Sequence, residues 1–378
     1  MGRQPIRVGI TGQGGFMGSH LYNYFGTKTE EIDRIAFQRS YFEDEIELQN
    51  FVKSCDVIVH IAAMNRHENQ QVIYDTNINL VKKLINACEV SSSTPRIIFS
   101  SSTQEEKDNL YGKSKRDGRK LLETWANKTK ASVCSLIIPN VFGPFGRPNY
   151  NSFIATFCYK ITNGEEPTII KDSDVNLIYI NELSHVIHNE IVNPKKNKIE
   201  TFFVPHTSSK KVSEILNLLK DFKTEYIDNG KVPKVDLNSF ELNLFNTFTS
   251  YISKSYFPRK FKKHTDDRGA FVEIIRAETS GQTSYSTTVP GITRGNHYHT
   301  RKVERFAVIK GKASIRIRKI NTDEIFEYII DGQTPAYVDM PIWYTHNITN
   351  IGDTELITLF WINEPYNPED ADTYFVEV

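Results

Sequence analysis

Three histidines and one glutamate in the last third of the sequence have the spacing of a metal site. His297 and His299 lie two residues apart, so on a β-strand their side chains project from the same face. Glu304 follows after four intervening residues, and His346 comes from a segment farther along the chain. Three imidazoles and a carboxylate suit zinc, and iron or manganese nearly as well, because ligand softness alone does not separate these ions. The sequence therefore predicts a metal site, with zinc as the favoured ion.

The residues around this set predict the small barrel that must hold it. From about residue 262 onward the chain reads as short alternating strands separated by turns, of which residues 312–318 are the clearest. Gly291 precedes the histidine pair, and Gly311 allows a turn into the next strand. These spacings resemble the two motifs of the metal cupins. Trp343 stands where the second cupin motif usually has glycine, so we expect that turn to be built differently.

A glycine-rich turn near the N-terminus is a second candidate site. Residues 11–18 follow the apolar run 6–10, and their glycines allow a tight strand-to-helix turn and close approach of the backbone to a pyrophosphate. The helix that follows presents its positive N-terminus to the phosphates. The predicted cofactor contacts in this turn are Gly12, Gly15, Phe16, Met17 and Gly18. We therefore expect a dinucleotide cofactor.

Arg39 indicates which dinucleotide is bound. NAD enzymes of this type carry an acidic residue about twenty positions after the glycines, where it bonds the ribose hydroxyl. This chain has Gln38-Arg39 at that place, and an arginine can pair with a 2′-phosphate. The alternative is a solvated surface arginine. NADPH is therefore favoured over NADH.

Tyr111 and Lys115 form the candidate proton relay. They are one helical turn apart on one face of a predicted helix. The hydroxyls of Ser102 and Thr103 follow the predicted strand 95–100, at the strand end where doubly wound sheets place their chemistry, and the sequence leaves open which of the two orients a carbonyl. A free tyrosine has a pKa of about 10, and we expect the nearby ammonium to lower it. The set fits hydride transfer coupled to proton transfer at a carbonyl, and Tyr111 and Lys115 are also expected to contact the cofactor.

The elements that position these residues follow from the apolar pattern. Short apolar strands alternate with helical stretches through residues 1–140, which predicts an α/β fold with a Rossmann-type doubly wound parallel sheet followed by an all-β cupin barrel. Residues 141–250 read as a less regular substrate-binding lobe, and residues 250–259 as a linker. The predicted domains are 1–255 and 256–378. The expected strands are 6–10, 34–37, 56–61, 95–100 and 131–137, with a helix over 77–87.

Composition narrows the class of protein. The 378 residues include 46 basic and 46 acidic ones, so no overall charge favours nucleic acid or an anionic membrane. Cys55, Cys88, Cys134 and Cys158 are scattered, which is typical of reduced thiols in a cytoplasmic protein. The sequence contains neither a signal peptide pattern nor a membrane-spanning apolar run, so we expect a cytoplasmic protein.

The N-terminal motifs together resemble the extended short-chain dehydrogenase/reductases, which act mostly on nucleotide sugars. The glycine turn, the serine cluster 100–102, the strand end His60-Ile61-Ala62-Ala63 and the Tyr111/Lys115 pair carry this resemblance. With a C-terminal cupin, the chain resembles the bacterial capsular polysaccharide reductase–epimerases, which follow the inverting UDP-GlcNAc dehydratase. The most specific stretches are Pro139–Gly143, Pro148–Ser152, Ala155–Lys160, Asp266–Gly269, Gly291–Thr293, Gly295–His297 and Asp372–Val378.

This resemblance implies a function. The cupin would epimerise C3 of a UDP-4-keto-6-deoxy-HexNAc, and the reductase would then reduce C4 with NADPH, in a homodimer. Asn140, Asn149 and Asn151 become candidate substrate contacts. The chain has Ile137-Ile138 where the family has a basic or bulky polar residue before the Pro-Asn pair, which leaves the C4 configuration open. A talo product leads toward L-fucosamine and a rhamno product toward L-quinovosamine.

Two alternatives remain open for the barrel. Asp267-Arg268-Gly269 and the segment 294–298 also resemble the dTDP-4-keto-rhamnose 3,5-epimerases, in which the corresponding histidine is a base. His297 would then abstract a proton and could not bind metal. In the other alternative the cupin is a non-catalytic dimerisation or sugar-sensing module beside a working reductase.

Overall fold

The computed structural model describes residues 4–195, 197–261, 263–266, 269–272, 274–275, 281–364 and 367–378. The chain forms two compact units. The first unit consists of Met1–Phe153 and Lys171–Val212, and the second of Ile154–Ile170 and Ser213–Val378.

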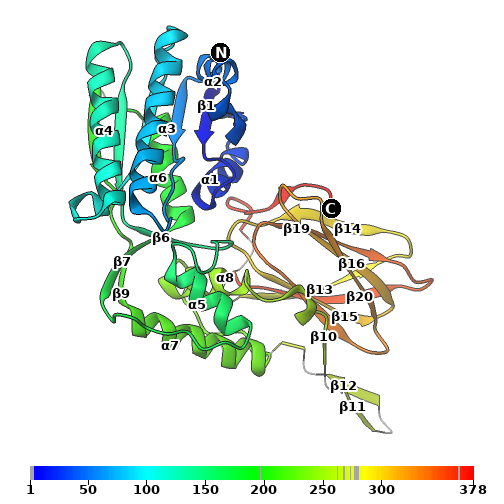
Figure 1. Ribbon diagram of the computed structural model, residues 1–378. Coiled ribbons are helices and arrows are strands. Elements are labelled where there is room, and N and C mark those ends of the chain that lie inside the picture. Colours follow the sequence, from blue (N-terminus) through cyan, green and yellow to red (C-terminus); the bar gives the residue numbers. More distant parts are fainter. Residues whose placement is uncertain are drawn as a thin grey trace. The chain divides into compact units, whose positions relative to one another are not determined.

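A six-stranded parallel sheet forms the centre of the first unit (Figure 1). Its strand order is β2-β1-β3-β4-β5-β8, and every neighbouring pair is parallel. The strands are β1 (Ile6–Thr11), β2 (Ile32–Ile35), β3 (Val57–His60), β4 (Arg96–Ser102), β5 (Val133–Ile138) and β8 (Ile199–Phe203). Most of these strands are apolar along their length because helices cover both faces of the sheet.

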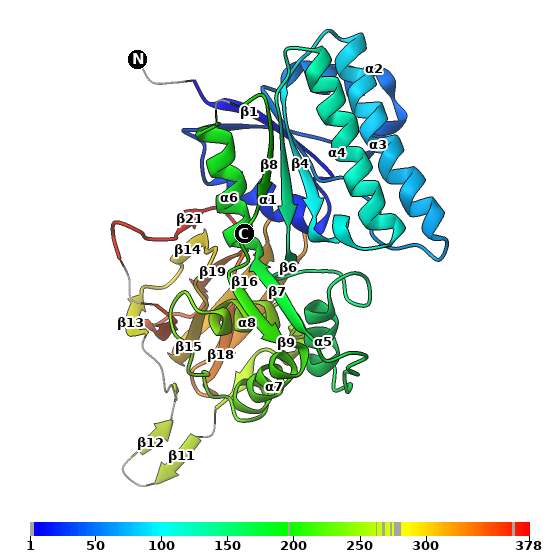
Figure 2. The same ribbon diagram turned by 90° about the vertical axis from the view of Figure 1, so that its left-hand side faces the viewer.

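Figure 2 shows the helices of this unit on the two faces of the sheet: α2, α3 and α4 on one side, α1 and α6 on the other. The side chains of Val52, Leu84, Ile97 and Leu122 are completely buried in the core between the first three helices and the sheet. The Rossmann-type doubly wound prediction is confirmed. The helices are α1 (Phe16–Gly26), α2 (Glu45–Ser54), α3 (Gln70–Val90), α4 (Leu110–Lys128) and α6 (Ile180–Val192).

One expected strand ends earlier than the sequence pattern indicates. Strand β2 stops at Ile35, so Ala36 and Phe37 lie outside it. The ring of Phe37 packs in the core against Phe42 and Phe51, with ring centroids 5.2 and 4.8 Å away. This packing turns the chain away from the sheet and into the short 3-10 helix η1 (Arg39–Glu43).

The predicted substrate lobe, residues 141–250, is divided between the two units. A three-stranded sheet, β6-β7-β9, belongs to the first unit, whereas α7, α8 and nearly all of α5 belong to the second. The elements are α5 (Phe153–Thr162), β6 (Asn140–Phe142), β7 (Asp174–Tyr179), β9 (Ser208–Lys211), α7 (Val212–Phe222) and α8 (Phe240–Thr249).

Two five-stranded antiparallel sheets make the barrel of the second unit, with strand orders β10-β18-β15-β20-β13 and β17-β16-β19-β14-β21. The all-β cupin prediction is confirmed. A separate hairpin pairs β11 (Lys263–Asp266) with β12 (Gly269–Val272). The barrel strands are β10 (Arg259–Lys260), β13 (Gln282–Thr288), β14 (Thr293–Tyr298), β15 (Glu304–Lys310), β16 (Lys312–Lys319), β17 (Ile325–Asp331), β18 (Ala336–Met340), β19 (Tyr344–Asn350), β20 (Leu356–Ile362) and β21 (Tyr374–Phe375).

The turn at Trp343 corrects one expectation. Trp343 has φ 62°, which is the left-handed conformation that a glycine would take, so the turn is not built differently. A left-handed non-glycine residue costs about 1–2 kcal/mol, and the surroundings of the tryptophan offset that cost. Its indole is buried and stacks on Tyr298 with ring centroids 5.6 Å apart. The backbone N–H of Trp343 donates to the backbone carbonyl of His299 at 2.8 Å.

Residues between α7 and β10 pack on the outer face of the barrel within the second unit. Arg305 on β15 pairs with Asp339 on β18, donating to both carboxylate oxygens at 2.7 and 3.0 Å, and its guanidinium lies 3.9 Å from the ring centroid of Tyr337. The same guanidinium donates to the carbonyl of Gly230 at 3.5 Å. The predicted domain boundary between residues 255 and 256 stays a prediction, but by packing residues 213–255 lie with the barrel.

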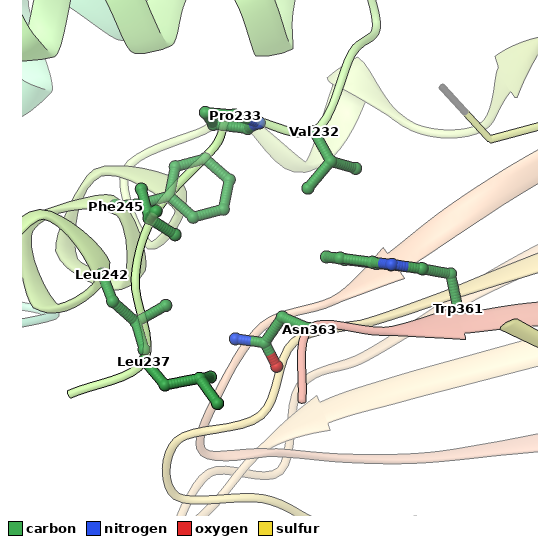
Figure 3. A pocket seen from close by; sticks show the side chains of 8 residues that line it. Val232, Pro233, Leu237, Leu242, Phe245, Trp361 and Asn363 are labelled. Atoms are coloured by element: carbon green, nitrogen blue, oxygen red, sulfur yellow. The ribbon is translucent and has the colours of Figure 1, made fainter. Parts of the chain in front are cut away.

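A small apolar pocket lies along this contact (Figure 3). Val232, Leu242 and Phe245 line it from the helical side, and Trp361 and Asn363 line it from β20 and the residues that follow. Trp361 is buried here, so the helical segment supplies part of the core that the outer face of the barrel needs.

Candidate reductase and metal sites

Helix α4 holds Tyr111 and Lys115 at the carboxyl end of β4. The helix begins at a cap in which the side chain of Asn109 accepts a hydrogen bond from the N–H of Gly112 at 2.7 Å. Lys115 is buried, and its Nζ donates to the carbonyl of Ser100 at 2.8 Å. The same Nζ lies 5.8 Å from the ring centroid of Tyr111, so the two predicted partners are brought together.

The electrostatics of this pair differ from the sequence-based expectation. Burial, and to a lesser extent the nearby Tyr150, raise the pKa of Tyr111 to about 12. Burial also lowers the pKa of Lys115 to about 8, against an opposing influence of Glu105. The expectation that Lys115 lowers the pKa of Tyr111 is therefore wrong, because both groups are buried and lose hydration.

Ser102 and Thr103 stand where β4 passes into the short 3-10 helix η2 (Thr103–Glu106). The Ser102 oxygen accepts a hydrogen bond from the N–H of Gln104 at 3.2 Å and so caps this helix. Its own O–H can still donate to a ligand. The Thr103 side chain is exposed. Both candidate hydroxyls thus lie at the carboxyl end of β4, near the start of α4.

The glycine turn has the geometry that a pyrophosphate site requires. Gly12 has φ +79°, and a Cβ there would lie 2.9 Å from the backbone of Ala62. A Cβ on Gly18 would lie 2.2 Å from the carbonyl oxygen of Gly12. Phe16 and Met17 form the first turn of α1, and Gly15 precedes it without a side-chain cap. The first N–H groups of α1 therefore remain open to a phosphate.

Arg39 begins η1, which is separated from the end of β2 by three residues, and its side chain is exposed. Within the described ranges of the chain, its guanidinium makes no ion pair with a carboxylate. A contact that the sequence did not reveal ties this region to the glycine turn: the side-chain oxygen of Gln13 accepts a hydrogen bond from the N–H of Phe37 at 3.0 Å. The glycine turn is thereby tied to the segment that leads into η1, two residues before Arg39.

The three candidate substrate asparagines lie in two places. Asn140, on β6, is exposed and donates to the carbonyl of Asn176 at 3.2 Å. Asn149 and the exposed Asn151 belong to one loop, in which Asn149 takes the left-handed φ of 54°. Sequence reasoning missed Arg66, which fixes this loop by donating to the carbonyls of Asn149 at 2.8 Å and Tyr150 at 3.1 Å.

The four predicted metal ligands converge inside the barrel of the second unit. Glu304 Oε2 lies 3.0 Å from Nε2 of His346, 3.3 Å from Nε2 of His299 and 3.9 Å from Nε2 of His297. One ligand atom from each residue lies within 4.8 Å of all the others. The side chains of His299 and His346 are 4% and 0% exposed, whereas that of His297 is 24% exposed. The cluster is therefore closed on one side and open at His297.

Backbone carbonyls orient two of these imidazoles. His299 Nδ1 donates to the carbonyl of Asp372 at 2.5 Å, and His346 Nδ1 donates to the carbonyl of Tyr344 at 3.2 Å. Each Nε2 is thereby left as the ligand atom. The Nε2 of His299 is buried and makes no hydrogen bond. This unpartnered nitrogen faces a carboxylate and two further imidazoles. Together they form a donor set that zinc takes, so the residues present fit a metal ion.

Charge is concentrated on the carboxylate of the cluster. Burial would raise the pKa of Glu304, but the three histidines around its carboxylate outweigh burial and hold that pKa well below its usual range. An ionised carboxylate is the form in which Glu304 can bind a metal ion.

The barrel surface beside the cluster is polar along β13. In the strand register, Glu304 pairs with Ile362, which pairs with Gln282, so these side chains share the inner face. Ser284 and Ser286 follow on the same face of β13. Sequence reasoning missed these residues, because only the register of β13 with β20 shows which of its alternating side chains point inward.

The resemblance to the 3,5-epimerases depends in part on Asp267 and Arg268. These two residues lie outside the described residues.

Comparison with known proteins agrees with these two sites. The sequence profile of the NAD dependent epimerase/dehydratase family matches residues 8–202, and that of the polysaccharide biosynthesis C-terminal domain matches residues 264–374. The chain belongs to the NAD-dependent epimerase/dehydratase family. Membership implies a nicotinamide cofactor, which the glycine turn of the first unit fits.

Individual relatives match over the whole length. A UDP-2-acetamido-2,6-beta-L-arabino-hexul-4-ose reductase of Pseudomonas aeruginosa is 31% identical over 99% of both chains. The crystal structure of the capsular polysaccharide assembling protein CapF of Staphylococcus aureus is 37% identical, with a TM-score of 0.61, and covers 99% of this chain and 100% of that one. A Bacillus subtilis spore coat polysaccharide biosynthesis protein, SpsL, is 27% identical over 30% of this chain and 82% of its own length. The resemblance to the capsular polysaccharide reductase–epimerases is confirmed, and with it a nucleotide-sugar reductase or epimerase role.

No helix among the described residues is long and apolar enough to cross a membrane. The four cysteines are all buried and free of disulfides.

Proposed function

We propose that this chain is a bifunctional nucleotide-sugar enzyme. The barrel epimerises C3 of a UDP-4-keto-6-deoxy-L-HexNAc, and the first unit reduces the C4 ketone with NADPH to give a UDP-2-acetamido-2,6-dideoxy-L-hexose. The observation that carries this proposal is the presence of two separate reactive sets in one chain: Tyr111 with Lys115 at the end of β4, and the histidine–glutamate cluster in the barrel.

The reductase site supports the second step. Bound NADPH supplies the hydride, and the alcohol that forms needs one proton. Tyr111 donates that proton from its phenol to the C4 oxygen, and Lys115 stabilises the phenolate that remains. A hydroxyl of Ser102 or Thr103 donates to the same oxygen and orients the carbonyl. Arg39 pairs with the 2′-phosphate, which is why NADPH is proposed over NADH.

The barrel supports the first step. His297, His299, Glu304 and His346 would hold a zinc ion, which would supply Lewis-acid polarisation of the C4 carbonyl and so make the proton at C3 more acidic. The chain contributes the shape of the site: two imidazoles are fixed by the carbonyls of Asp372 and Tyr344. The inward hydroxyls of Ser284 and Ser286 offer polar contacts to the sugar.

One observation favours a second candidate mechanism. His297 is the most exposed member of the cluster and the farthest from Glu304, at 3.9 Å. A metal-free barrel in which His297 is the general base would need such an accessible imidazole. C3 exchange by the metal-free protein distinguishes the two mechanisms, because this alternative predicts full C3 exchange without metal.

The proposed test uses the full chain with the UDP-4-keto sugar and NADPH, with products identified by NMR. We expect inversion at C3, reduction at C4 and oxidation of one NADPH per sugar, and the same spectrum gives the talo or rhamno configuration. A product reduced at C4 but retained at C3 would leave the chain a reductase with a non-catalytic barrel. A fragment that begins at residue 256 is unsuitable, because residues 213–255 cover the barrel.

Two further properties belong to this proposal. The chain would work as a homodimer, as the family resemblance implies, and in the cytoplasm, where NADPH and UDP-sugars are found together. Neither nucleic acid nor a membrane is needed as a partner.

A further inference from the structure

Glu105 is a buried carboxylate next to the candidate reductase residues, and the proposed reaction does not use it. It lies in η2 and is 7% exposed. Its carboxylate accepts a hydrogen bond from the hydroxyl of Ser101, the residue before Ser102 on β4. It also accepts from Arg119 on α4, through Nε at 3.1 Å and Nη2 at 2.8 Å. One side chain thus joins the three elements that carry the reductase residues.

The backbone contact between η2 and α4 is equally close. A Cβ on Gly112 would lie 1.9 Å from the carbonyl oxygen of Gln104, so only glycine allows this approach. Arg116 on α4 donates to the carbonyl of Glu105 at 3.3 Å. Helix α4 therefore cannot slide along η2 without breaking these bonds, and the position of Tyr111 relative to Thr103 depends on them.

The charges around the Lys115 ammonium are a second way in which Glu105 affects the reductase residues. Among the described residues, the titratable groups that interact with Lys115 are His60 from β3, Tyr111 from its own helix and Glu105 from η2. Burial lowers the pKa of His60 to about 3, so that imidazole is neutral, and Tyr111 is protonated near neutral pH. Of these groups Glu105 is the anion.

We propose that Glu105 is the positioning residue of the reductase site. It fixes the end of β4 and η2 against α4, so that a hydroxyl of Ser102 or Thr103, the phenol of Tyr111 and the ammonium of Lys115 meet at one substrate oxygen. This inference rests on the proposed reduction at C4. Glu105 does not touch the substrate and acts through the residues that do.

The sign of the pH effect follows from the charges. Lys115 assists Tyr111 only while it is an ammonium, so activity is lost as the pH rises through the pKa of Lys115. That pKa is lowered to about 8 by burial, and Glu105 opposes the lowering. Replacement of Glu105 by glutamine removes the opposing charge, so the alkaline limb of the kcat profile moves to lower pH. Glu105→Asp keeps the charge and should keep the limb closer to that of the wild type.

Glu123 provides a matched control. It accepts from Arg119 Nη1 at 2.9 Å, as Glu105 accepts from the other guanidinium nitrogens, but in the described part of the chain it makes no hydrogen bond to β4. Glu123→Gln therefore removes one charge partner of Arg119 and leaves the link to Ser101 intact. Ser101→Ala does the reverse, since it removes the link to β4 without changing any charge.

The experiment measures kcat, KM for the keto sugar, NADPH affinity and the pH profile for each variant. We expect Glu105→Gln to lower kcat on the order of 10- to 100-fold, as displacements near 1 Å do, with KM and NADPH affinity within about twofold. Ser101→Ala should lower kcat without moving the alkaline limb, and Glu123→Gln should change neither. If Glu105→Gln no longer binds NADPH, its fold is lost. The kcat of Ser101→Ala then tests the inference in its place.

Two results would overturn the inference. One is an unchanged kcat in folded Glu105→Gln or, where that variant does not fold, in Ser101→Ala. The other is an equal loss in Glu123→Gln, which would mean that the stability of α4 alone is at issue. A wild-type chain that binds NADPH but does not reduce the keto sugar would overturn the proposed function itself, and the role of Glu105 with it.

Discussion

We expect the second unit to lose much of its stability when the ion pair between Arg305 and Asp339 is broken. The two side chains are 2% and 5% exposed and are joined by hydrogen bonds of 2.7 and 3.0 Å, so neither charge has access to water. Asp339→Asn would leave the guanidinium buried without a counter-charge. Removing one partner of a buried pair costs about 3–5 kcal/mol, which corresponds to a urea midpoint lower by roughly 1–2 M for a unit of this size.

The assay is urea unfolding followed by circular dichroism and by tryptophan fluorescence, since Trp343 and Trp361 lie in the second unit. The double variant Arg305→Met, Asp339→Leu is the control, because replacing both charges by apolar groups of similar volume is often neutral or stabilising. We expect the single variant to be far less stable than the double one. A single variant with the wild-type midpoint, or a double variant as unstable as the single one, would refute the reasoning.

The remaining predictions concern the two sites and one turn. Tyr111→Phe should lower NADPH oxidation by about 10²–10⁴-fold, because the proton donor is lost, and steady-state kinetics should show this without weaker NADPH binding. Arg39→Ala should weaken NADPH binding more than NADH binding in fluorescence titrations; equal effects would make Arg39 a bystander. His299→Ala should strip the metal, measured by elemental analysis as a fall from about one ion per chain, while NADPH binding in the first unit persists. Trp343→Gly should be more stable to urea than Trp343→Ala by roughly 1 kcal/mol, because only glycine takes φ 62° without cost; the reverse order would mean that the turn is unstrained.

Local patterns explain what the sequence could predict. The glycine turn and the strand that precedes it were predictable, because a close contact such as that between Gly18 and the Gly12 carbonyl excludes every other residue type. The shared face of His297 and His299 was predictable because a two-residue spacing places both side chains on one face of a strand whatever surrounds it. Both features depend on chain geometry over a few residues.

Long-range packing explains what the sequence could not predict. The early end of β2 depends on a core that Phe37 reaches only in the folded unit. The raised pKa of Tyr111 follows from burial, which a helical spacing does not reveal. Arg66 and the packing of residues 213–255 on the barrel likewise depend on partners tens of residues away, and Glu105 depends on Arg119, which lies 14 residues away on another element.

Deuterium incorporation at C3 shows whether the barrel and the first unit catalyse different steps. The UDP-4-keto sugar is incubated in D2O without NADPH, with the wild-type chain, Tyr111→Phe and His299→Ala in parallel, and C3 is followed by NMR. We expect one deuterium at C3 with the wild type and with Tyr111→Phe, and none above the uncatalysed rate with His299→Ala. No deuterium with the wild type, or equal incorporation with His299→Ala, would contradict this expectation.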